Sequence, residues 1–273
     1  MIKLPAFAAQ FFPSLRTNPF GAVSQPASGI DFVADQVMQP VTADFHRDPT
    51  AWRVNHLPLV VGQVKPELLP KLSGRREAPD IQLDIDCLPP GLSFAACADQ
   101  IGKAASIKSR AIREEIARDA LLPLWAGLAQ QIIVQDEKWF GAQKHSNVLL
   151  HREHIRPQDD EMGHGRYKFA GVWHRDAVSI ADGSTTRVYA IRSNNPMHVL
   201  SNRLTEGVPN DGQGNVYGHG FEHMAARAKR RPQAGEIVLM NGGAGTGTVH
   251  ASHVPQRGEG GPSCFFAVNC LSR

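Results

Sequence analysis

The sequence of 273 residues has little of what marks several protein classes. It contains only four cysteines, at Cys87, Cys97, Cys264 and Cys270, and no two of them form a Cys-x-x-Cys pair. This spacing argues against a zinc ribbon and against a disulfide scaffold, so we expect a reducing, cytoplasmic environment. The N-terminal apolar run is broken by prolines and is too short for a membrane span, so no membrane association is expected.

Aromatic residues are also few, at 7% of the chain, and the formal net charge is only +3. The tightest basic cluster, residues 227–231, precedes Pro232 and is typical of a solvated helix end. Because basic and aromatic residues are not interleaved, we do not expect nucleic-acid binding. With 42% hydrophobic and 20% charged residues, the chain has the composition of a soluble globular protein. Because it is small and lacks polymer-binding features, its expected partner is a small-molecule substrate.

The two halves of the chain have different patterns. Residues 1–146 are rich in proline and hold short extended pieces and one amphipathic helical pattern, residues 106–135, which Pro123 should kink or restart. Residues 147–273 hold short strand-like runs separated by Gly, Asn and Asp turns. We therefore expect an α+β protein with an N-terminal region of helices and short strands, 1–146, that supports a β-rich core, 147–273, in one continuous domain.

The run FAGVWHRDAVSI, residues 169–180, carries a histidine and an aspartate two positions apart, His174 and Asp176. In a strand, residues i and i+2 point to the same face, so the imidazole and the carboxylate would converge. A metal ion is one reason for that convergence. The alternatives are a buried His–Asp hydrogen bond, or a strand end at which Arg175 and Asp176 reach water.

A further histidine follows in AGEIVLMNGGAGTGTVHASHV, where a buried strand and a glycine-rich turn precede His250. We expect a neighbouring strand to return this imidazole to the interior, and His253 is its rival. Two histidines and one carboxylate that leave three positions open are the ligand set of non-haem Fe(II) that binds O2 and an organic acid. The net charge of such a site, near +1, suits an anionic co-substrate.

The order of the segments WHRD, GEIVLMNGG, TVHASHVPQ and SCFFAV resembles the Fe(II)- and 2-oxoglutarate-dependent oxygenases. The resemblance implies a double-stranded β-helix, or jelly-roll, core in which His174, Asp176 and His250 are the catalytic iron ligands. It also implies 2-oxoglutarate and O2 as co-substrates. The implied reaction is hydroxylation or desaturation of a small molecule, such as an amino-acid derivative or a secondary metabolite. In this family a carboxylate at the position of Asp176 distinguishes hydroxylases from halogenases.

The chain departs from the family where many members hold the distal carboxylate of 2-oxoglutarate with an Arg-x-Ser pair. Ser263 fits the serine, but glycine occupies the arginine position. A buried carboxylate without a cation is costly, so the base must come from elsewhere. Arg187, with Tyr189 on the same strand face, is the expected clamp, and Arg257 is a second candidate. If the opposite face of the strand points inward, Arg192 takes over.

Two other functions fit the same residues. The missing arginine is compatible with a cupin-like metalloenzyme of another class, such as an O2-dependent dioxygenase without 2-oxoglutarate or a zinc hydrolase. The third alternative is a metal-free jelly-roll binding protein, in which His174 and Asp176 form only a structural hydrogen bond.

Overall fold

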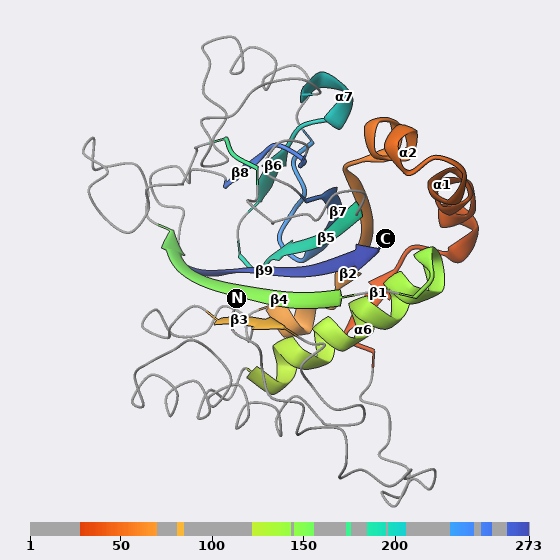
Figure 1. Cartoon of the computed structure of the whole chain (residues 1–273). Coiled ribbons are helices and arrows are strands. Elements are labelled where there is room, and N and C mark those ends of the chain that lie inside the picture. Colours follow the sequence, from red (N-terminus) through yellow and green to blue (C-terminus); the bar gives the residue numbers. More distant parts are fainter. Residues whose placement is uncertain are drawn as a thin grey trace, which may run out of the picture.

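The fold is mixed α and β, with antiparallel sheets in an arrangement consistent with a jelly roll (Figure 1). The computed structural model describes residues 28–69, 81–84, 122–142, 145–155, 173–175, 185–194, 196–205, 230–242, 247–252 and 261–272. In that part of the chain, no helix is both long enough and apolar enough to cross a membrane.

A seven-stranded sheet forms the centre of the molecule, in the order β1-β2-β7-β5-β9-β4-β3. Its strands are β1 (Ile30–Phe32), β2 (Leu59–Val64), β3 (Ile81–Asp84), β4 (His145–Ile155), β5 (Thr185–Arg192), β7 (Glu236–Asn241) and β9 (Gly261–Ser272). The second half of the chain supplies its four contiguous strands β7, β5, β9 and β4. The N-terminal region extends the same sheet at both edges, with β1 and β2 beside β7 and with β3 beside β4.

A small sheet of two antiparallel strands, β6 (Met197–Val199) and β8 (His250–Ser252), accompanies the large one. Two isolated bridges widen it, one from His174 to His250 and the other from Val199 to Arg230. The strand-like runs expected in the second half of the sequence therefore correspond to β4 to β9 where they fall on described residues.

The longer helices cover the side and one face of the large sheet, and a short helix follows β6 of the small sheet (Figure 1). They are α1 (Asp35–Arg47), α2 (Pro49–His56), α6 (Leu122–Phe140) and α7 (Asn202–Thr205), with a short 3-10 helix, η1, at Pro66–Leu68. The start of α2 is well defined, because the Asp48 carboxylate accepts hydrogen bonds from the backbone N–H groups of Thr50 and Ala51. Of the helix expected over 106–135, the portion from residue 122 onward belongs to α6, and residues 106–121 lie outside the described part.

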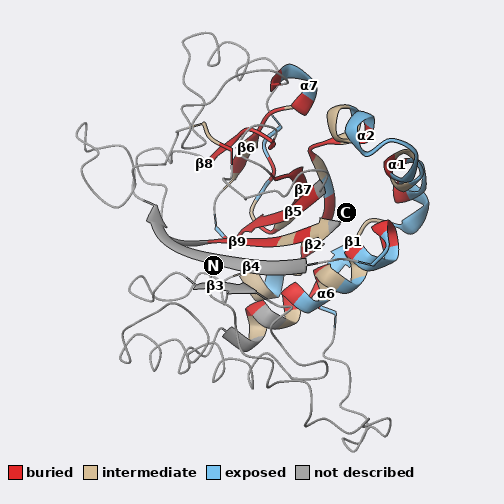
Figure 2. Cartoon of the chain, in the orientation of Figure 1, coloured by how far each residue is buried: buried red, intermediate tan, exposed pale blue. Residues whose placement is uncertain are grey.

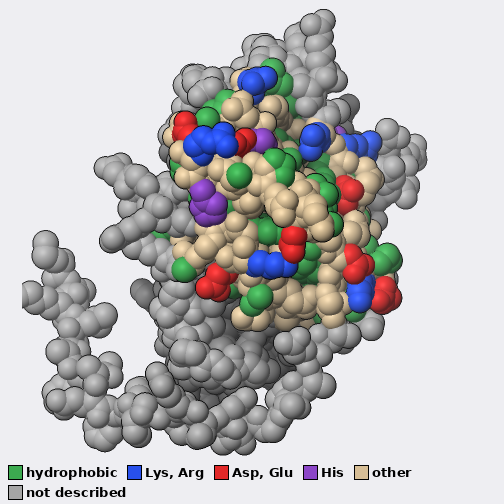
Figure 3. Space-filling view, turned by 90° about the vertical axis from the view of Figure 1, so that its right-hand side faces the viewer, with side chains coloured by type: hydrophobic (Ala, Val, Ile, Leu, Met, Phe, Trp, Pro, Cys, Tyr) green, Lys and Arg blue, Asp and Glu red, His purple; other side chains and the backbone are tan. Residues whose placement is uncertain are grey.

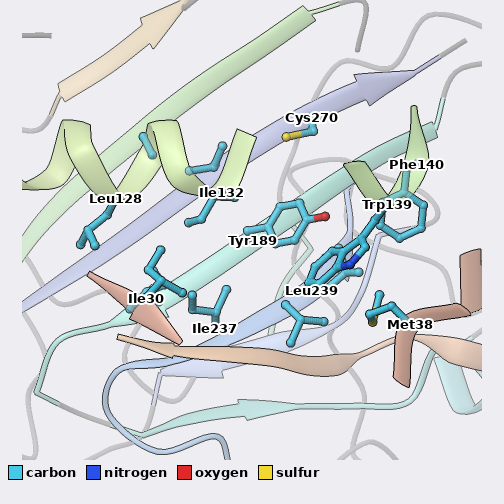
Figure 4. Close-up of a cluster of buried hydrophobic side chains, with 14 of the residues drawn as sticks. Ile30, Met38, Leu128, Ile132, Trp139, Phe140, Tyr189, Ile237, Leu239 and Cys270 are labelled. Carbon is cyan, nitrogen blue, oxygen red and sulfur yellow. The ribbon is translucent and has the colours of Figure 1, made fainter. Parts of the chain in front are cut away.

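The large sheet separates two apolar layers, because its central strands alternate strictly. Tyr189, Ile191 and Phe266 face α6 and join the larger core cluster, whereas Ala190 and Phe265 face the small sheet and join the second cluster. Figure 2 shows the buried centre of this sheet, and Figure 4 shows Tyr189 among side chains of α6, β7 and β9. The helix and the small sheet thus cover opposite faces of the large sheet.

The surface on the helical side carries charges of both signs. On the face drawn in Figure 3, Lys and Arg side chains of the described residues are interspersed with Asp and Glu side chains. The exposed ion pairs of α1 and α6 include Lys138 of α6 with Asp35 of α1, and Arg47 with Asp44 within α1. Pairs this exposed contribute little to stability.

Candidate functional site

His174 and His250 lie side by side across an antiparallel bridge of the small sheet. The backbone N–H of His174 donates to the carbonyl of His250 at 2.9 Å, and the reverse hydrogen bond measures 3.0 Å. Their ring centroids are 4.4 Å apart, although the two residues are separated by more than seventy positions in the sequence. Directly paired residues of an antiparallel ladder project to the same face, which is why the two imidazoles meet.

The remaining expected ligands lie outside the described residues. Asp176 follows the last described residue of its segment, and His253 directly follows β8. Among the residues that the structure does describe, no group of three His, Cys, Asp or Glu side chains comes together. The structure therefore brings together two of the three residues in the expected set, His174 and His250.

His250 is buried and its ring is oriented by two neighbours. Its Nδ1 lies 3.1 Å from the carbonyl oxygen of Thr248, and its ring stacks on Phe265 with centroids 6.4 Å apart. Because a carbonyl oxygen can only accept, this hydrogen bond assigns the proton of a neutral imidazole to Nδ1. The lone pair is then on Nε2, the atom that would bind a metal, and such a fixed tautomer is usual for metal-binding histidines.

Arg175, directly after His174, does not reach water as the alternative of an exposed strand end required. Its side chain is buried, with Nε donating to the carbonyl of Gly247 at 3.0 Å and Nη2 donating to the carbonyl of Thr205 at 2.8 Å. Burial lowers the pKa of Arg175 from its usual value. The segment that carries His174 is thereby tied to the segment that leads into His250.

Arg187 and Tyr189 face α6 and meet a carboxylate that the sequence analysis did not single out, that of Asp136. The Arg187 guanidinium donates from Nε and Nη2 to the two oxygens of Asp136, each at 2.6 Å, and the Tyr189 hydroxyl donates to Oδ1 at 2.6 Å. All three side chains are completely buried. Since Tyr189 lies on the α6 side of β5, this pair is on the opposite face of the large sheet from Phe265 and His250.

A sequence signal for Asp136 does exist. Leu128, Ile132 and Asp136 are four residues apart on α6, and Phe140 continues the same row, so the aspartate occupies a place in the buried apolar stripe. A carboxylate in such a stripe requires a buried cation or hydrogen-bond donors.

Arg192 lies on the other face of β5. It is the residue that we expected to bind the distal carboxylate of 2-oxoglutarate if that face pointed inward. The side chain is buried, and its guanidinium carbon is 5.3 Å from the centroid of the Phe265 ring, which itself stacks on His250. Arg192 and Phe265 are direct partners in the register of β5 and β9. This places a buried cation on the side of the sheet that faces the two histidines.

The two other expected co-substrate residues give less information. Ser263 belongs to β9 and its backbone is paired with Glu153 of β4. Arg257 lies outside the described residues.

No family model and no curated protein matches the sequence. Among solved structures, a variant of the iron and alpha-ketoglutarate-dependent endoperoxidase NvfI is similar over 78% of this chain and 83% of its own, at 8% identity and a TM-score of 0.35. CytC3 with Fe(II) and alpha-ketoglutarate is similar over 86% of this chain and 76% of its own, at 10% identity and a TM-score of 0.35. These TM-scores are too low to support a functional assignment, so function must be argued from the residues.

Proposed function

We propose that this protein is a non-haem Fe(II)- and 2-oxoglutarate-dependent oxygenase that hydroxylates, or desaturates, a small molecule. The observation that carries the proposal is the pairing of His174 with His250 across one bridge of the small sheet, with 4.4 Å between their ring centroids. Asp176, two residues beyond His174, is the proposed third ligand. Two imidazoles and one carboxylate make the ligand set of Fe(II) oxygenases.

The strand pairing supports a double-stranded β-helix as the fold of the core. β4 pairs with β9, the segment of His174 pairs with β8, β5 pairs with β7, and β6 pairs with the segment of Arg230. Each of these pairs encloses the next along the chain, so a single long hairpin, folded onto itself, generates the core as in a jelly roll. Contacts of β5 with β9 and of β6 with β8 then form the two sheets.

The residues present fit a ferrous ion. His250 presents Nε2 as a donor because its Nδ1 is engaged by Thr248, and the adjacent His174 supplies the second imidazole. Bound iron would supply the redox chemistry that couples O2 and decarboxylation of 2-oxoglutarate to succinate with oxidation of a substrate C–H bond. The apolar side chains of Val199 and Phe265 lie beside His250 and would exclude water from the site, which would strengthen the electrostatic interactions of a charged co-substrate.

We assign the distal carboxylate of 2-oxoglutarate to Arg192. It is the buried arginine on the histidine-facing side of β5, whereas Arg187 and Tyr189 are engaged with Asp136 on the other side. A guanidinium can hold a carboxylate through two parallel hydrogen bonds, and the low dielectric of a buried site makes such a contact strong. Arg257 and Ser263 stay as the next candidates if Arg192 does not serve.

An anaerobic spectroscopic titration tests the proposal. Protein loaded with Fe(II) should develop a weak visible charge-transfer band when 2-oxoglutarate is added, and admission of O2 with substrate should release succinate. Iron binding without this band at any 2-oxoglutarate concentration would instead favour a cupin-like metalloenzyme of another class. Failure to bind any metal would favour a jelly-roll binding protein.

A further inference from the structure

The residue between the two ligands of the His-x-Asp segment is unusual in its burial. Arg175 has only 2% of its surface exposed, and arginines are seldom buried to this degree. Its side chain donates to two backbone carbonyls, those of Gly247 and Thr205. A guanidinium has no acceptor atom, so Arg175 is not itself a ligand of the proposed metal.

The two carbonyls that Arg175 binds belong to segments that control His250. Gly247 lies three residues before His250, and Thr205 is the last residue of α7. A second contact links these two segments, because the Thr248 hydroxyl donates a hydrogen bond to the side-chain oxygen of Asn202, the first residue of α7, at 2.7 Å. The carbonyl of the same Thr248 accepts from Nδ1 of His250. Arg175, α7 and the segment 247–250 thus form one buried hydrogen-bonded unit.

The backbone alone holds the histidine strands together weakly. The bridge between His174 and His250 is isolated and has two backbone hydrogen bonds, whereas a ladder such as that of β4 and β9 continues over eleven residue pairs. Arg175 adds two hydrogen bonds from a charged donor, which are stronger than those between neutral groups. Two imidazoles that share one metal must both place a nitrogen about 2.1 Å from it, so small shifts between the strands change the metal affinity.

We propose that Arg175 is a positioning residue that fixes the separation and orientation of His174 and His250, and thereby sets the metal affinity of the site. This inference rests on the proposed function only in that the two histidines bind a metal. The side chain carries out this role through the carbonyls of Gly247 and Thr205.

The test compares Co(II) binding by wild type, Arg175→Met, Arg175→Lys and a matched control, Arg230→Met, in otherwise intact protein. Co(II) occupies nitrogen and oxygen sites and its visible spectrum reports their geometry. Arg230 is a suitable control because it also donates to a backbone carbonyl, that of Pro58 at 3.3 Å, but from the other edge of the same small sheet. Thermal unfolding of each metal-free variant shows whether it folds.

We expect Arg175→Met to weaken Co(II) binding by about 10- to 100-fold and to change the visible spectrum, as removal of outer partners of metal ligands usually does. Arg175→Lys keeps a cation that can reach one carbonyl, so its affinity should be intermediate. If Arg175→Met does not fold, the expected loss for Arg175→Lys decides the matter. Arg230→Met should stay within about twofold of wild type, because strand β6 lies between Arg230 and His250 and the Arg230 side chain bonds to Pro58, outside the small sheet.

Two results would overturn the inference. One is Co(II) affinity within about twofold of wild type in every folded Arg175 variant, and the other is an equal loss in Arg230→Met, which would indicate general destabilisation. A different result would contradict the proposed function alone. If wild type binds Co(II) and the Arg175 variants weaken that binding, but Fe(II) and 2-oxoglutarate give no band, the positioning role is supported and the oxygenase assignment is not.

Discussion

Arg187 and Arg192 lie on the same strand, β5, but their positions differ by an odd number of residues, so they serve opposite layers. Arg187 forms a buried bidentate pair with Asp136 and lies close to the rings of Phe45 and Phe140, with its guanidinium carbon 5.2 and 4.7 Å from their centroids. Arg192 lies instead against the ring of Phe265. The face of the strand therefore separates an arginine that pairs with Asp136 in the core from one that lies on the side of the two histidines.

Replacement of Arg192 by Met should raise the KM for 2-oxoglutarate by about 10- to 100-fold, which corresponds to the loss of a hydrogen-bonded contact to a charged group. Fe(II) affinity should not change, because Arg192 is not a proposed ligand. Arg192→Lys keeps the positive charge and should recover part of the loss. Steady-state kinetics of succinate release measure the KM of each variant for 2-oxoglutarate. A KM that is unchanged in Arg192→Met would transfer the anchoring role to Arg257.

The buried hydroxyl of Tyr189 should make the free energy of unfolding depend on pH in the alkaline range. Burial, and then the negative charge of Asp136, raise the pKa of Tyr189 well above its usual value. In the unfolded chain the same phenol ionises near pH 10. The tyrosine therefore stabilises the fold fully below about pH 10, and its contribution falls as the pH rises further, because only the unfolded state then releases the proton.

Tyr189→Phe should show a shallower fall in the free energy of unfolding between about pH 9 and 11 than wild type, while being less stable at neutral pH. Urea unfolding at a series of pH values measures both quantities. Other alkaline groups contribute equally to the two proteins, so the difference in slope isolates Tyr189. Identical slopes would mean that this phenol ionises in the folded protein as it does in water.

At the scale of elements, one turn joins three strands of the large sheet. Gly235 precedes β7, donates its N–H to the carbonyl of Arg192 at the end of β5 (2.7 Å), and accepts at its own carbonyl from Val64 at the end of β2 (2.8 Å). Its φ of +80° lies in the left-handed region, and an added Cβ would lie 2.6 Å from Nε2 of Gln63. The position therefore requires glycine.

Gly235→Ala should lower the free energy of unfolding by at least about 1–2 kcal/mol, the cost of the left-handed backbone before the steric clash is added. Gly127→Ala is the matched control, because it lies within α6 with no atom within 4 Å of an added Cβ. That change should be neutral or stabilise the protein by up to about 1 kcal/mol. Urea denaturation of both variants provides the comparison, and equal effects would contradict this explanation.

Some elements could be predicted from the sequence and others could not. The strands of the second half were predictable because alternating and continuous apolar runs end at glycine and asparagine turns, as in β7 and β9. The helices α1 and α2 were harder to locate, since Pro40 and Pro49 resemble breaks. Pro49 instead occupies the first turn of α2, where a missing N–H has no cost.

At the scale of the whole molecule, local patterns singled out His174 and His250, which the structure pairs, but could not identify the partners of the buried charges. Asp136 and Arg187 are 51 residues apart, and their contact depends on how α6 crosses the sheet. The same holds for Arg175, whose acceptors are carbonyls from α7 and from the segment before β8. Such partners follow from tertiary packing, which no periodicity in a single segment encodes.

If His174 and His250 hold one metal ion together, both histidines are necessary for metal binding. An anaerobic Fe(II) titration should compare wild type, His174→Ala, His250→Ala and a control, His56→Ala. His56 is a suitable control because it belongs to α2, outside the small sheet, and its ring pairs with Asp44 of α1. We expect one tightly bound Fe(II) in wild type and His56→Ala, and loss of that binding in each of the other two variants. Retention of one tightly bound Fe(II) by His174→Ala or His250→Ala would contradict this expectation.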